Sequence, residues 1–202
     1  MNLAILEIGQ EQEVQIIKNA QIGDHAALSQ LISLYTSRIY RLALRLTGNE
    51  QDAEDVLQET FLIMIKKIKQ FQMKSSFYTW MYRIAVNVGL RHLKTKRFKY
   101  QHVSIDDPDI ERVSSMETQE WPAIDYDRIN RKKFRKKLDS AIEQLPEIYR
   151  TVFILRDLHE LSTEDAAKIL NITVSNVKIR LMRARNFLKD HLEDLVKAEA
   201  MI

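Results

Sequence analysis

Apolar residues recur at intervals of three and four along most of this chain, and this spacing restricts the chain to helical folds. The first such run contains Leu28, Leu31, Tyr35, Ile39, Leu42 and Leu46. Because an α-helix has about 3.6 residues per turn, these side chains share one face. Only four glycines and three prolines occur among the 202 residues, so few positions interrupt a helix. The pattern predicts an all-α protein.

Stop and start signals divide the first half of the chain into three predicted helices. Gly48 ends the first helix, and Asn49 can cap the second, which we expect to run to about Phe71. The third helix is predicted over residues 77–98. The predicted buried stripe of the second helix is Ala53, Leu57, Thr60, Met64 and Ile68.

The second half of the chain ends in a pattern that predicts a helix-turn-helix. Two apolar stripes meet at Pro146, and Ser162 with Asp165 then forms a capping-box pattern for a short helix. Residues 171–173 form a tight turn, where Thr173 can cap the last helix. The two stripes are Phe134, Leu138, Ile142 and Leu145, then Ile148, Val152, Leu155 and Leu158.

Between these halves the periodicity is lost. The segment is acidic and contains Pro108 and Pro122, features typical of a flexible linker. We therefore predict two small helical domains joined by a flexible linker. Their bounds are an N-terminal extension over 1–21, frayed at its start, a helical domain over 22–99, the linker over 100–127 and the helix-turn-helix domain over 128–202.

Several function classes are disfavoured by composition. The chain has no cysteine, so it can form neither disulfides nor thiolate sites. No apolar run reaches the roughly 20 residues of a membrane span, and we expect a cytoplasmic protein without membrane insertion. The five histidines are dispersed, and no glycine-rich phosphate loop occurs. We therefore expect no catalytic residues, metal, cofactor or small-molecule substrate.

The last helix gives the strongest functional signal. One side is predicted to be core: Val174, Val177, Leu181, Ala184 and Leu188. The other side carries Ser175, Asn176, Ile179, Arg180, Arg183 and Asn186. Small, amide and guanidinium groups suit base edges and phosphates in a major groove. We expect phosphate contacts from Lys178 and Arg185, nearer the core edge. The alternative is a solvated face on an ordinary helical hairpin.

The third helix predicts a second nucleic-acid surface. Trp80, Arg83, Asn87, Arg91 and Lys94 share one face, and Phe77 and Tyr78 add rings just before it. Cations beside aromatic rings suit single-stranded DNA, because phosphates pair with the cations and bases stack on the rings. The alternative is that the rings, Trp80 above all, are core anchors and the cations are merely solvated.

The second helix predicts a protein-binding surface. Its exposed face holds Asp55, Gln58, Glu59 and Leu62, with Ile65 nearby. Apolar residues among acids, outside the core stripe, are typical of a docking patch, although single exposed apolar residues are also common. The acids lack the Glu-x-x-His partner of a di-iron bundle.

Three segments in this order resemble one family. NEQDAEDVLQETFL, SFYTWMYRIAVN and LSTEDAAKILNITVSNVKIRLMRARNFL are similar to the extracytoplasmic-function group of the sigma-70 family. The resemblance covers residues 22–99 and 128–195 and implies a sigma factor. Such a factor recruits core RNA polymerase to promoters, recognises the minus-thirty-five and minus-ten elements and helps to melt DNA.

The resemblance also assigns residues to roles. The polymerase-docking segment matches Asp52, Glu54, Asp55, Gln58, Glu59 and Leu62. The minus-ten segment matches Phe77, Tyr78, Trp80, Arg83, Asn87, Arg91, Lys94 and Arg97. The minus-thirty-five reader matches Ser175, Asn176, Lys178, Ile179, Arg180 and Arg183. Many members carry an acid where this chain has Arg91, so we expect an altered minus-ten preference or an added phosphate contact there.

The resemblance implies core RNA polymerase and promoter DNA as partners, with an anti-sigma factor as a further candidate. Two other hypotheses stay open at this point. A helix-turn-helix regulator would bind an operator without polymerase, and a helical enzyme would use the acids of the second helix as a metal site. Exposed Leu62 among those acids favours the sigma factor, because a repressor has no use for a docking patch.

Overall fold

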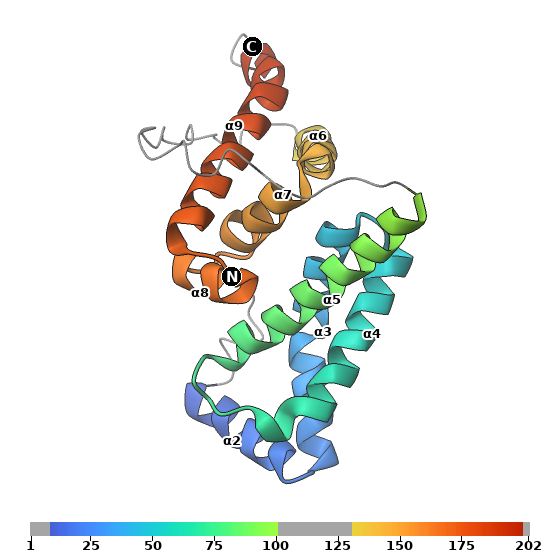
Figure 1. The fold of residues 1–202 in the computed structure, drawn as a ribbon, viewed down its shortest axis with the longest axis vertical. Coiled ribbons are helices and arrows are strands. Elements are labelled where there is room, and N and C mark those ends of the chain that lie inside the picture. The colour runs from blue at the N-terminus through green and yellow to red at the C-terminus, as the bar shows by residue number, and fades with distance from the viewer. Residues whose placement is uncertain (1–8, 101–130, 200–202) are drawn as a thin grey trace. The chain divides into compact units, whose positions relative to one another are not determined.

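The computed structural model describes residues 9–100 and 131–199, without the side chains of 96–100, 131–135 and 193–199. The chain divides into two compact units, Met1–His102 and Val103–Ile202. Every regular element within the described ranges is helical (Figure 1), which confirms the predicted all-α class. Apart from its first residue, the predicted linker lies outside the described residues.

Between residues 9 and 100, the described part of the first unit, there are four α-helices and a short 3-10 turn. They are α2 (Gln10–Gln21), α3 (His25–Thr47), α4 (Glu50–Lys67), the 3-10 turn η1 (Ile68–Gln70) and α5 (Phe77–Tyr100). Helix α3 packs against α2, α4 and α5. It ends as predicted at Gly48, whose φ of 77° is in the left-handed region that glycine adopts without strain. The side chain of Asn49 then caps α4 by accepting from the Asp52 backbone N–H.

The buried face of α4 is wider than predicted and leaves out one predicted residue, Leu57. Val56 and Phe61 are buried, while Leu57 is only half-buried. Ala53 and Val56 pack with Ala43 of α3 and Val88 of α5, so α4 faces two helices at once and buries a wider arc than a single stripe. The backbones approach closely at Gly89, where an added Cβ would lie 3.1 Å from Leu46 Cδ1.

Helix α2 occupies most of the predicted N-terminal extension. It buries Ile16, Ile17 and Ala20 and is bonded to the rest of the unit. Gln21 Nε2 donates to the carbonyl oxygens of Ile68, at 3.0 Å, and Phe71, at 2.7 Å. The buried Tyr35 hydroxyl donates to Glu13, and burial raises the pKa of this phenol. The expectation of a frayed start is therefore wrong from Gln10 onward, because an apolar face there finds a partner.

The second unit contains the predicted helix-turn-helix. Its elements are α6 (Arg131–Gln144), α7 (Glu147–Phe153), a π-helical turn η3 (Ile154–Leu158), α8 (Thr163–Leu170) and α9 (Val174–Glu199). Ser162 caps α8 by accepting from Asp165 N. Asn171 ends that helix in the left-handed region, and Thr173 Oγ1 accepts from Asn176 N at 3.1 Å. The caps lie where the sequence predicts them.

Candidate protein and nucleic-acid interfaces

The outward face of α4 is acidic with an apolar centre. Glu54, Asp55 and Gln58 are exposed, and Leu62 is 56% exposed beside exposed Ile65. Glu54, Gln58 and Leu62 follow each other at intervals of four residues, so they lie along one line of the helix surface. Exposed apolar side chains on the same helix as exposed carboxylates, about two turns further along it, have the form of a protein-docking patch. We call these five residues the α4 docking face.

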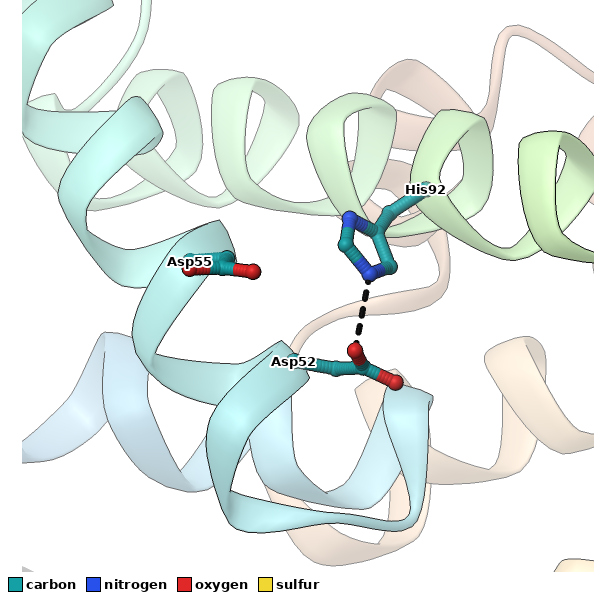
Figure 2. Close-up of side chains that lie close together, drawn as sticks. All are labelled: Asp52, Asp55 and His92. Carbon is teal, nitrogen blue, oxygen red and sulfur yellow. Dashed lines mark hydrogen bonds and ion pairs between the residues drawn. The ribbon is translucent and has the colours of Figure 1, made fainter.

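Asp52, also predicted to dock polymerase, is buried. Its Oδ1 accepts from His92 Nε2 of α5 at 3.0 Å (Figure 2). Its Oδ2 accepts from Asn49 Nδ2. Only 5% of Asp52 is exposed. The carboxylate therefore cannot contact a partner directly. It fixes the first turn of α4 to α5, a role that spacing along α4 alone does not reveal.

The acids of α4 also come close to a histidine. One ligand atom from each of Asp52, Asp55 and His92 lies within 4.8 Å of the others. Figure 2 shows Asp55 beside this pair without a dashed interaction to it. Both oxygens of Asp52 have hydrogen-bond partners, so a structural brace accounts for its burial.

Replacing Asp52 with alanine should destabilise the first unit. The change removes one hydrogen bond from Asn49 and one from His92, and each such bond contributes about 0.5–1.5 kcal/mol to stability. We expect a lower urea midpoint in a denaturation curve followed by circular dichroism. Asp55→Ala is the matched control, because Asp55 is an exposed carboxylate one turn away. Equal stability of the two variants would contradict the brace.

Arg91 pairs with the docking helix. Its guanidinium donates to Glu59 Oε1 on α4, and the two side chains are 59% and 46% exposed. The sequence predicts Arg91 on the minus-ten face of α5 and Glu59 on α4 as a docking residue. In the structure Arg91 and Glu59 instead form an ion pair with each other. They can do so because Arg91 lies on the side of α5 that faces α4.

The aromatic residues at the start of α5 form a cluster within the unit. Phe77 is 2% exposed, and its ring centroid lies 5.3 Å from Tyr35, 5.4 Å from Phe71 and 5.4 Å from Trp80. The prediction that Phe77 contacts DNA is therefore wrong. Trp80 is half-buried against Phe71 at 5.0 Å. Only part of the Trp80 ring is left for a base.

The remaining minus-ten candidates are polar residues on the outer face of α5. Arg83, Asn87 and Lys94 are exposed. The side chain of Arg97 lies outside the described residues. Tyr78 is half-buried, with its ring centroid 4.1 Å from Tyr82 and the Arg38 guanidinium 5.4 Å from its centroid. Arg38, on α3, was missed by the sequence analysis because only the packing of α3 against α5 brings it there.

The predicted reading face of α9 is only partly open. Ser175 and Lys178 are exposed, and Asn176, Ile179 and Arg180 are half-buried. Arg183 is held by α7, since its Nη1 donates to the Tyr149 hydroxyl at 2.9 Å and its Cζ lies 5.9 Å from the Tyr149 ring centroid. The expectation that Arg183 projects from the centre of a free face is therefore wrong.

Arg185 is also engaged within the second unit. Its Nε and Nη2 donate to the two carboxylate oxygens of Asp157 at 2.8 and 2.7 Å. The hydrogen bonds to Asp157 raise the pKa of Arg185. A bidentate pair of this kind fixes both side chains, so the predicted phosphate contact from Arg185 does not fit the structure. Lys178, predicted for the same task, is exposed.

Two family descriptions match the two units. Sigma-70 region 2 matches residues 31–99, and Sigma-70 region 4 matches residues 135–188. The chain is 32% identical to the ECF RNA polymerase sigma factor SigW of Bacillus subtilis, over 89% of this chain and 96% of that protein. It is 31% identical to the RNA polymerase sigma-H factor of Pseudomonas aeruginosa, over 93% of this chain and 97% of that protein.

Solved structures share the fold at lower sequence identity. CnrH, solved in complex with the cytosolic domain of CnrY, matches with a TM-score of 0.63 and 20% identity, over 89% of this chain and 96% of that chain. The sigma factor RpoE of Bartonella quintana, solved with the anti-sigma factor NepR, matches with a TM-score of 0.61 and 23% identity, over 82% of this chain and 96% of that chain. These similarities support the arrangement of helices.

Proposed function

The chain belongs to the extracytoplasmic-function group of the sigma-70 family of RNA polymerase sigma factors, and from this premise we propose which surfaces do its work. The α4 docking face binds core RNA polymerase. The outer face of α5 binds the minus-ten element, and α9 reads the minus-thirty-five element. The predicted domain bounds, 22–99 and 128–202, assign one unit to each promoter element.

The observation that carries the docking assignment is Leu62 at 56% exposure on α4, the helix that also exposes Glu54 and Asp55. An exposed leucine is costly to hydrate. A basic, partly apolar partner would bury this leucine and form ion pairs with the acids of the same helix. Arg91 and Glu59 neutralise each other at the edge of this face. The centre of the proposed contact is therefore Glu54, Gln58 and Leu62.

The minus-ten assignment rests on the charge of α5. This helix has no acidic residue, and Arg83, Asn87 and Lys94 are exposed on it. Lysine and arginine bind phosphates, and an amide can bind a base edge. Trp80, half-buried beside Arg83, offers at most one ring edge or part of one face to an unpaired base.

As a sigma factor of this kind the chain would act as an adaptor without catalytic residues of its own, in the cytoplasm, where core polymerase and the chromosome meet. No helix within the described residues is long and apolar enough to cross a membrane. We include an anti-sigma protein among the partners, because RpoE, to which this chain is similar in fold, was solved with one.

Reconstitution with core RNA polymerase tests the proposed function. The purified chain should form a holoenzyme on size-exclusion chromatography and direct run-off transcription from a subset of a genomic promoter library. Binding to duplex DNA without any association with core polymerase would instead identify a helix-turn-helix regulator.

Lys178 should contribute a phosphate contact in the upstream element. Because it is exposed on α9, Lys178→Ala should weaken binding to all upstream sequences to a similar extent and lower the salt slope by about one unit. The measurement is fluorescence anisotropy of holoenzyme on a panel of upstream variants at several salt concentrations. Lys189→Ala is the control, since Lys189 is exposed about three turns further along α9. A loss confined to one sequence would indicate a base contact instead.

A further inference from the structure

Acidic residues are unevenly distributed among the helices of the first unit. Helices α3 and α5 contain no aspartate or glutamate, whereas α4 contains Glu50, Asp52, Glu54, Asp55 and Glu59. Helices α3 and α5 pack against each other. The two acid-free helices therefore adjoin each other, and the side-chain formal charges that they carry are all positive, so α5 supplies only part of this positive charge.

The cations of α3 lie on one flank of that helix. Arg38, Arg41 and Arg45 are spaced by three and four residues, so they lie on the same side about one turn apart. Arg38 lies 5.4 Å from the ring centroid of Tyr78 on α5, and the positive charges of Arg38 and Arg41 act to lower the pKa of buried Tyr82 on the same helix. The contact places Arg38 on the α5 side of α3, and the spacing places Arg41 and Arg45 on the same flank. We call these three residues the α3 arginine flank.

Arg41 has no evident role in stabilising the fold. Its side chain is exposed, in contrast to half-buried Arg38 and Arg45, and a long cationic side chain held away from the core contributes little to stability. Arg38 lies over a ring, an arrangement in which a planar guanidinium still presents N–H groups at its edge. Both residues are therefore suited to bind an external anion.

The chemistry of the flank favours nucleic acid over protein. Protein interfaces are anchored by exposed apolar or aromatic side chains. Among the described residues, the well-exposed large apolar side chains are Ile22, Leu62, Ile65 and Met73, and none of them lies on α3. A row of arginines without an apolar anchor instead matches the repeating charge of a phosphate backbone.

We propose that the α3 arginine flank binds the sugar-phosphate backbone of promoter DNA next to the bases contacted by α5. The strand then lies across both helices, with phosphates on Arg38 and Arg41 of α3 and on Arg83 of α5. The flank carries no sequence information and sets affinity and register, as phosphate contacts do. This inference rests on the proposed function, because it extends the minus-ten surface of α5 onto α3.

The salt dependence of Arg41→Ala tests the proposal. The probe is a fluorescein-labelled promoter fragment from the run-off selection, with its minus-ten region unpaired by a mismatch bubble. Loss of one phosphate contact should lower the slope of log affinity against log salt by roughly 0.7–0.9. At low salt we expect Arg41→Ala to bind the fragment about three- to tenfold more weakly than the wild type does. The difference in affinity should shrink as the salt concentration rises, because salt screens the interaction.

The control is Lys18→Ala, which removes one exposed cation from α2, a helix that also carries acids. Its slope should equal that of the wild type. An Arg41→Ala slope equal to the wild type would overturn the proposal. Weaker binding to core polymerase with an unchanged DNA slope would overturn it as well, because the flank would then be a protein contact.

Two measurements keep this proposal apart from the proposed function. Holoenzyme formation by the wild type tests the function alone. The DNA slopes are measured both for holoenzyme and for the chain without core polymerase. One outcome is that the wild type does not bind polymerase, while Arg41→Ala still lowers the salt slope of DNA binding. This outcome would refute the sigma-factor assignment of surfaces and retain the α3 arginine flank as a DNA contact.

Discussion

Leu62→Arg should prevent assembly with core RNA polymerase while leaving the chain folded. In the free chain Leu62 is 56% exposed on the α4 docking face, and we propose that polymerase buries it. In Leu62→Arg the complex would have to bury a charge in its place, and removing that charge from water is costly. Loss of a central anchor costs about 2 kcal/mol or more, which corresponds to at least about 30-fold weaker binding. Surface changes away from the core alter folding free energy by only about 0.5 kcal/mol.

Ile22→Arg is the matched control for this variant. Ile22 is a large apolar residue at 84% exposure, and it lies between α2 and α3 rather than on α4. Both variants should keep the wild-type circular dichroism spectrum, and only Leu62→Arg should lose the holoenzyme peak on size-exclusion chromatography. A Leu62→Arg chain that assembles normally would disprove the docking assignment. Loss of assembly in both variants would point to a general effect of added charge.

Phe77→Ala should strongly destabilise the first unit, and Phe77→Leu should retain DNA binding. The Phe77 ring is 2% exposed within the cluster of Tyr35, Phe71 and Trp80. Removing such a ring costs about 3–5 kcal/mol. At about 4–8 °C per kcal/mol for a unit of this size, the midpoint of thermal unfolding should fall by more than roughly 10 °C.

The leucine variant separates a packing role from a stacking role. Leucine preserves an apolar side chain of similar size, and we expect a smaller loss of stability, within about 1–2 kcal/mol. If Phe77 only packs, Phe77→Leu holoenzyme should bind the bubble fragment as the wild type does. If the ring stacked on a base, its loss should cost about 1–3 kcal/mol of binding. Anisotropy on the same fragment distinguishes the two outcomes.

Much of the fold could be predicted because its signals are local. Gly48 and Asn49 act within one turn of the chain, and so do Ser162 and Thr173. Apolar periodicity identified the core side of α9, with Val177, Leu181 and Ala184 buried as predicted. The motifs that resemble the sigma-70 family are also contiguous, so they could be found before any helix was placed.

The incorrect predictions concern residues that lie at contacts between helices. A helical wheel gives the angle of a side chain around its own axis but not which neighbour covers it. Asp52 and Arg91 both lie on predicted functional faces, yet Asp52 is buried with a hydrogen bond to His92, and Arg91 pairs with Glu59. Phe77 entered an aromatic cluster whose other rings come from α3, the segment after η1 and α5 itself.

Residues within a few positions of each other therefore specify the helices, their caps and the charge that each helix carries. Which of those charges face solvent depends on how the helices pack. Arg183 and Arg185 look equivalent to other cations of α9, but Tyr149 and Asp157 engage them across 34 and 28 positions of the chain. Arg38 and Arg41 join the surface of α5 for the same reason. Contacts between distant segments depend on how helices pack, and no local pattern encodes that packing.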